Sequence, residues 1–158
     1  MSFTKFIATV AIAAATVTGS AALAEVPTGG NRLFKSLDQA GVTYSMGNCA
    51  EHGIENTYGF FVPAKNHIHI CDDVATTTEQ QWETFRHEAV HAAQRCVNPS
   101  MAFTVNSSQF LLQNGSQSDW EFIQRAYDRE DWAIELEAFT LMRQSNAQIA
   151  ELVDTACN

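Results

Sequence analysis

Apolar and polar residues follow two periods along the chain. Apolar side chains recur at helical spacing in residues 31–40, and a glycine follows as a stop, so a short helix is predicted there. Residues 42–46, 57–62 and 67–71 alternate in polarity or are rich in aromatic and β-branched side chains, which is typical of strands. A four-residue turn separates the last two, so we expect them to form a hairpin.

Two helical stretches follow the predicted strands. Residues 78–96 contain no Gly or Pro, and Thr78 with Gln81 has the spacing of a capping box. Residues 118–144 are again helical in pattern, with a break expected near Asp128. The order of elements predicts an α+β fold, in which a small, mostly antiparallel sheet packs on the helix of residues 78–96.

The first long helix carries the segment HEAVH, in which His87 and His91 flank Glu88. Imidazoles four residues apart share one face of a helix and can bind one zinc ion from the same side. The intervening glutamate can then take a proton from a zinc-bound water. The alternative is a plain helix with two surface histidines and a solvated glutamate.

A catalytic zinc ion needs a third protein ligand. The metzincin extension requires Gly and His where this chain has Gln94 and Val97, so that class is excluded. No histidine follows the HExxH motif, and a histidine ligand would have to be His52, His67 or His69, upstream of it. A glutamate on the downstream helix remains, which is the gluzincin arrangement.

The downstream segment ELEA, residues 135–138, resembles the E-x-x-A segment on the glutamate helix of gluzincin metallopeptidases. Together with HEAVHAAQ, it is similar to small zincin-like domains of secreted bacterial and phage-type proteins. The resemblance covers two helices and implies that His87, His91 and Glu135 bind Zn²⁺, with Ala138 permitting close helix packing. Glu137 lies about 200° further around the helix, so both glutamates cannot face one ion.

The residues that surround the zinc-binding glutamate in thermolysin-type enzymes are absent here. The hydrogen-bond partner of the zinc histidines is therefore unassigned, and Asp131 is the nearest candidate. A peptidase also needs a neutral donor for the tetrahedral oxyanion. Tyr127 is the first candidate, whereas Tyr58 and His52 are poorer ones.

The N-terminus has the pattern of a signal peptide over residues 1–24. Lys5 precedes an apolar run, and an A-x-A cleavage signal ends at Ala24. Residues 25–158 suit one compact domain without a further membrane-spanning run, so we expect a periplasmic or secreted monomer. The formal net charge of −9 argues against nucleic acid as a partner.

All four cysteines lie in residues 25–158, and an even count in an exported chain predicts two disulfides. A four-thiolate zinc site is a weak alternative, because no C-x-x-C pair is present. Four cysteines allow three connectivities, between which sequence alone does not choose. Our prediction is Cys49–Cys71, tying the loop before the hairpin to its second strand, and Cys96–Cys157, fastening the C-terminal tail to the HExxH helix.

These observations predict zinc-dependent peptide-bond hydrolysis outside the cytoplasm, with Glu88 as general base and a polypeptide as substrate. The alternative is a zinc-stabilised binding or inhibitor module that uses the same three ligands without turnover. The two differ at the metal. A peptidase keeps one coordination position open, whereas a structural site is closed by a fourth protein ligand.

Overall fold

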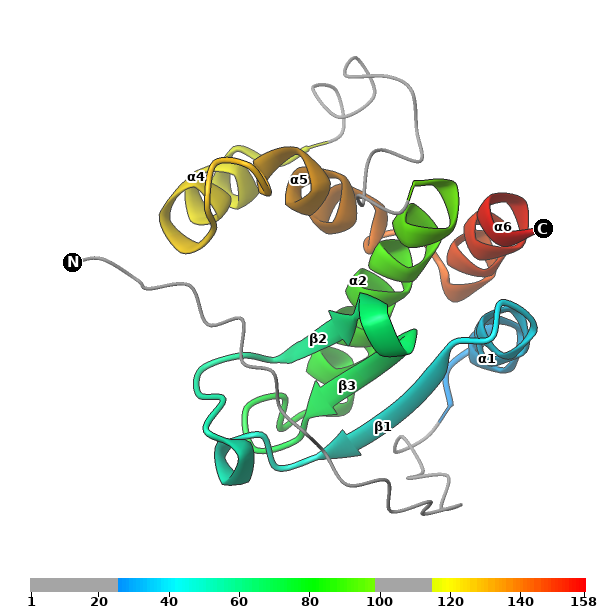
Figure 1. Ribbon diagram of the computed structural model, residues 1–158, viewed down its shortest axis with the longest axis horizontal. Helices are drawn as coiled ribbons and strands as arrows, with labels where there is room; N and C mark the ends of the chain where they lie inside the picture. Colours follow the sequence, from blue (N-terminus) through cyan, green and yellow to red (C-terminus); the bar gives the residue numbers. More distant parts are fainter. Residues whose placement is uncertain (1–25, 99–114) are drawn as a thin grey trace.

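The computed structural model describes residues 26–98 and 115–158 (Figure 1). The predicted signal peptide, residues 1–24, lies outside the described residues. Five helices and three strands form an α+β fold in the part that is described. The helices are α1 (Gly30–Gln39), α2 (Thr78–Val97), α4 (Gln117–Ala126), α5 (Trp132–Leu141) and α6 (Asn146–Cys157), and the strands are β1 (Thr43–Gly47), β2 (Gly59–Val62) and β3 (His67–Cys71).

The sheet is mixed rather than mostly antiparallel. Its order is β1-β3-β2, and the predicted hairpin of β2 and β3 is antiparallel, whereas β1 runs parallel to β3. Alternation of side chains predicts a strand but carries no information on the direction of its neighbour. Because β3 lies in the centre, β2 is left as an edge strand.

The two faces of β3 have different roles. Ile68 and Ile70 are 0% and 1% exposed and belong to the core under α2. His67 and His69 lie on the opposite face, where the Ser45 hydroxyl is 2.8 Å from a ring nitrogen of each. Full burial of an isoleucine contributes about 1.5–3 kcal/mol, so this alternation fixes which side of the sheet receives α2.

Helix α2 begins at Thr78, as predicted, but its capping box lies one residue earlier than expected. Thr77, with an extended backbone, accepts a hydrogen bond from the Gln80 amide, and the Gln80 side chain accepts one from the Thr77 amide. Residues 76–78 are all threonines, which offers the same capping pattern in neighbouring registers. The box at Thr77 and Gln80 is therefore a one-residue shift from Thr78 and Gln81.

The sequence pattern predicted a C-terminal tail, but the structure has a further helix, α6. Ser145 and Gln148 form a capping box at its start, and Ile149, Ala150 and Val153 are fully buried. Helix α6 packs against both α1 and α2, on the side of α2 away from α4 (Figure 1). It therefore closes the core that α1 and the sheet leave open.

Two disulfide bonds join all four cysteines. They are Cys49–Cys71 and Cys96–Cys157, with Cα–Cα distances of 5.2 and 5.0 Å. These are the two pairs predicted from the sequence. Within residues 26–98 and 115–158, no helix is long and apolar enough to cross a membrane.

Candidate metal centre

His87 and His91 project from the same face of α2, as their spacing of four requires. Their side chains are almost fully buried, and their Nε2 atoms lie 3.0 Å apart. Glu135, from the first turn of α5, reaches both rings. Its Oε2 lies 3.2 Å from His87 Nε2 and its Oε1 lies 3.5 Å from His91 Nε2.

The spacing of these atoms suits a metal ion. Ligand atoms at the usual distances from a tetrahedral zinc ion lie about 3.3–3.5 Å from one another, close to the separations of 3.0, 3.2 and 3.5 Å. Glu135 Oε2 is buried and accepts no hydrogen bond of acceptable geometry. The group of His87, His91 and Glu135 could therefore hold a metal ion.

The charges around this group favour a cation. Burial would lower the pKa of His91, but its contact with Glu135 and the charge of Glu88 raise this pKa to about 9. Burial would raise the pKa of Glu135, but contacts with His87 and His91 lower it to about 2. The Glu135 carboxylate is therefore ionised at neutral pH, although it is largely removed from water.

Glu88 lies beside this group but is not part of it. Its side chain is 5% exposed, and it contacts the backbone of Phe61 in edge strand β2. Burial, together with the charge of Glu135, raises the pKa of Glu88 against the opposing effect of His87 and His91. A raised carboxyl pKa makes Glu88 a better proton acceptor.

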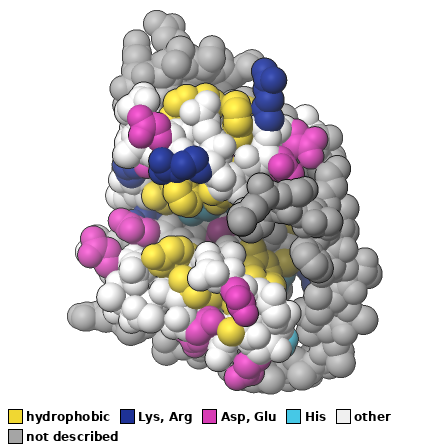
Figure 2. Space-filling model, turned by 90° about the vertical axis from the view of Figure 1, so that its left-hand side faces the viewer, with side chains coloured by type: hydrophobic (Ala, Val, Ile, Leu, Met, Phe, Trp, Pro, Cys, Tyr) yellow, Lys and Arg dark blue, Asp and Glu magenta, His cyan; other side chains and the backbone are white. Residues whose placement is uncertain are grey.

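A cleft of about 900 Å³ opens over these residues, between edge strand β2, helix α2 and the α4–α5 pair. Figure 2 shows its mouth, with hydrophobic side chains on both sides. Tyr58, before β2, and Phe122, on α4, are 48% and 46% exposed and line the two sides. The ring of Phe122 packs against Phe139, with 5.7 Å between the ring centroids. Phe139 in turn packs against His87, with 4.7 Å between the ring centroids.

Tyr127 lies in the same cleft, next to the candidate metal centre. Burial raises its pKa, as do the charges of Glu135 and Glu88 and a hydrogen bond with Glu135. The phenol is therefore protonated at neutral pH and can donate a hydrogen bond. Tyr58 also lines the cleft but is half exposed to solvent. His52 lies in a short exposed turn that does not line the cleft.

The partner of His91 is Gln94, not Asp131. Gln94 Oε1 lies 2.7 Å from His91 Nδ1, while Asp131 lines the cleft and immediately precedes α5. The HEAVHAAQ segment contained the signal, because a side chain three residues after a helical histidine lies on the same face. In the sequence analysis, Gln94 was considered only as a departure from the metzincin motif, not as a partner of His91.

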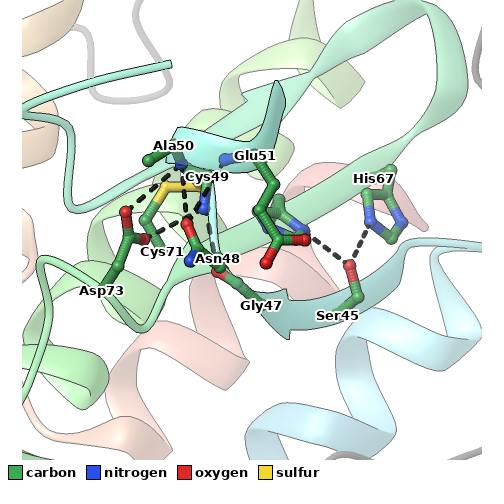
Figure 3. The surroundings of a disulfide bond; sticks show 10 residues. Ser45, Gly47, Asn48, Cys49, Ala50, Glu51, His67, Cys71 and Asp73 are labelled. Atoms are coloured by element: carbon green, nitrogen blue, oxygen red, sulfur yellow. Dashed lines mark hydrogen bonds between the residues drawn. A yellow bond between two sulfur atoms is a disulfide. The ribbon is translucent and has the colours of Figure 1, made fainter. Parts of the chain in front are cut away.

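The upstream histidines do not reach the candidate metal centre. His67 and His69 are on the sheet face away from α2, where they contact Thr43 and Ser45. The nearby group of Cys49, Cys71 and Asp73 is not a thiolate site, because the two cysteines form a disulfide (Figure 3). The Asp73 carboxylate instead accepts hydrogen bonds from the Cys49 and Ala50 amides.

The fold and the buried histidines and glutamate define a small α+β domain with a candidate metal centre between helices α2 and α5. The chain belongs to the family described as Domain of unknown function (DUF8637), which matches residues 31–157. No curated protein and no solved structure matches the chain.

Proposed function

We propose that this domain is a zinc-dependent peptidase that hydrolyses polypeptides outside the cytoplasm. The observation that carries the proposal is that α2, α5 and edge strand β2 meet in one cleft. His87, His91 and Glu135 form a triangle of ligand atoms, and the buried Glu88 lies beside it, facing the edge of the sheet.

The donor set supports zinc. Two imidazole nitrogens and one carboxylate are a ligand set of catalytic zinc sites, whereas structural zinc sites are usually closed by four protein ligands rich in cysteine. Among the described residues, the group that contains His87, His91 and Glu135 has no fourth His, Cys, Asp or Glu. An open position in a cleft favours catalysis over the alternative of a non-catalytic zinc-stabilised module.

The surrounding residues have the roles that hydrolysis requires. A bound zinc ion would supply a Lewis acid, which lowers the pKa of water and polarises a carbonyl oxygen. Glu88 would take a proton from the water while the water oxygen attacks the scissile carbonyl carbon. It would then give that proton to the amine as the C–N bond breaks. Tyr127 would donate a hydrogen bond to the developing oxyanion.

The cleft suits an extended polypeptide. Among residues 26–98 and 115–158, β2 has no neighbouring strand on one side of its backbone, and residues 59–61 line the cleft. An extended segment can pair with such an edge through main-chain hydrogen bonds. The exposed rings of Tyr58 and Phe122 would contact its apolar side chains.

The two disulfides support a location outside the cytoplasm. Such bonds persist in oxidising compartments and are rare in the cytosol. Both are formed in this small domain, and the signal-peptide pattern of residues 1–24 agrees with export.

The test combines zinc stoichiometry with hydrolysis of an unfolded polypeptide, with and without a chelator. Glu88→Gln should keep one zinc per chain but lose about 10²–10⁴-fold in kcat, the usual contribution of a general base. Glu79→Gln makes the same change on an exposed residue of α2 outside the cleft lining, and it should retain both zinc and activity.

Two results would contradict the proposal. A Glu88→Gln variant that keeps most of its activity would show that Glu88 is not the base. Wild-type protein that binds one zinc ion but cleaves no member of a broad peptide library would favour the non-catalytic binding module.

A further inference from the structure

A chain of hydrogen bonds leads from His91 to a second glutamate of α5. Gln94 Oε1 lies 2.7 Å from His91 Nδ1, and Gln94 Nε2 lies 2.6 Å from Glu137 Oε2 and 3.0 Å from the Ile134 carbonyl oxygen. Gln94 and Glu137 are both 0% exposed. We refer to these two side chains as the Gln94–Glu137 bridge.

The chemistry of the amide fixes the direction of these bonds. An amide nitrogen only donates and an amide oxygen only accepts. Two oxygen acceptors, from Glu137 and Ile134, lie next to one end of the Gln94 amide, so this end must be the NH₂ group. The oxygen of Gln94 then faces His91, and His91 Nδ1 must carry the proton that this oxygen accepts.

The position of that proton decides the chemistry of the other ring nitrogen. In a neutral imidazole, protonation of one nitrogen leaves the other with a free lone pair. In the neutral His91 ring, the form that binds a metal ion, the free nitrogen is Nε2, the atom that lies 3.0 Å from His87 Nε2 and 3.5 Å from Glu135. The bridge therefore selects the tautomer that can bind a metal ion at this site.

We propose that Gln94 and Glu137 are positioning residues, which hold the His91 ring and its tautomer ready for the metal. This inference rests on the metal binding of the proposed function. Neither residue belongs to the candidate ligand group. Glu137 acts through Gln94, and Gln94 acts through Nδ1 of His91.

Zinc affinity, measured by competition with a chelator, tests the bridge without any assay of hydrolysis. Gln94→Met and Glu137→Met keep similar side-chain lengths but remove the polar groups. Each should lower zinc affinity by about 10- to 100-fold, the usual effect of losing the partner of a metal-bound histidine. Glu137→Gln keeps an acceptor for Gln94 and should stay within a few-fold of wild type.

A double-mutant cycle distinguishes this role from general destabilisation. Because both residues act through one hydrogen bond, the Gln94→Met/Glu137→Met protein should bind zinc no more weakly than the weaker single variant. Thr140→Val is the matched control, since Thr140 is buried on the same helix but its hydroxyl donates to the Leu136 carbonyl of that helix. It should leave zinc affinity unchanged.

Nuclear magnetic resonance of the zinc-loaded protein gives a second readout. The proton on His91 Nδ1 should be visible in the wild type and in Thr140→Val, and it should exchange with water faster in Gln94→Met. Unchanged zinc affinity in both single Met variants, or fully additive losses in the double variant, would overturn the bridge while leaving the proposed function intact. Wild-type protein that binds no zinc would overturn both.

Discussion

Removal of the Cys96–Cys157 disulfide should destabilise the domain by an amount set mainly by loop closure. The bond joins the end of α2 to the end of α6 across a sequence separation of 61. Cys96 is exposed and Cys157 is half-buried, so serine at these positions leaves no deeply buried hydroxyl. Cys49 and Cys71 are 1% and 0% exposed, and their replacement would add a packing cost.

The chain-entropy model gives the magnitude. For a loop of this length, the unfolded state gains about 14 cal/mol/K when the bond is removed, which corresponds to about 4 kcal/mol at 25 °C. For a domain of this size, the midpoint of thermal unfolding should fall by about 15 °C. This is a large part of the stability of an ordinary domain, which is about 5–15 kcal/mol.

Urea and thermal unfolding of Cys96→Ser/Cys157→Ser would measure the loss. Val97→Ser is the control, because Val97 is 50% exposed at the same helix end, and it should change the free energy of unfolding by no more than about 0.5 kcal/mol. A loss below about 1 kcal/mol in the double variant would refute the reasoning. It would mean that residual structure already restrains the chain between residues 96 and 157 in the unfolded ensemble.

Three further predictions address the cleft and the sheet. In kinetic assays of hydrolysis, Tyr127→Phe should lower kcat by about 10²–10³-fold with little change in KM, since the phenol is expected to act on the oxyanion; a change confined to KM would contradict this role. Burial lowers the pKa of both His67 and His69 below 6.5, so below that pH the unfolded chain binds protons that the folded chain does not. Urea titrations should therefore show the free energy of unfolding falling as pH drops below about 6.5. The fall should be less steep in His67→Gln/His69→Gln. An equally steep fall in that variant would assign the pH dependence elsewhere. Gly59→Ala should lower the free energy of unfolding in urea by about 1–3 kcal/mol, because its Cβ would lie 2.6 Å from Thr84 Cγ2 and 2.7 Å from the His69 carbonyl oxygen. Adding Thr84→Ala should restore little of this loss, because the contact with the backbone oxygen remains. Full recovery would show that the backbone contact is harmless.

Features confined to a single helix or strand could be predicted from the sequence. The spacing of His87 and His91 places both rings on one face of α2 whatever the rest of the fold does, and their Nε2 atoms are 3.0 Å apart. Ile68 and Ile70 followed in the same way from strand alternation. In both cases, the period of the local backbone decides where the side chains point.

Other features, including two that depend on tertiary contacts, were not predicted. The parallel pairing of β1 with β3 depends on which edge of the hairpin remains free, and alternation does not encode this. Helix α6 is a different case, because its local signal, the capping box of Ser145 and Gln148, was present in the sequence but was missed. The contact of Gln94 with Glu137 joins residues 43 positions apart, and no local period relates them.

The two glutamates of α5 illustrate how a correct geometric rule can still leave a residue without a role. A separation of about 200° around the helix prevents Glu135 and Glu137 from facing the same ion, yet both are buried, at 9% and 0% exposure. A buried carboxylate is destabilising unless it has partners. Glu135 contacts the two imidazoles and Glu137 accepts a hydrogen bond from Gln94. Both therefore bear on His91, one from the side of the candidate metal centre and the other through the far nitrogen of the ring.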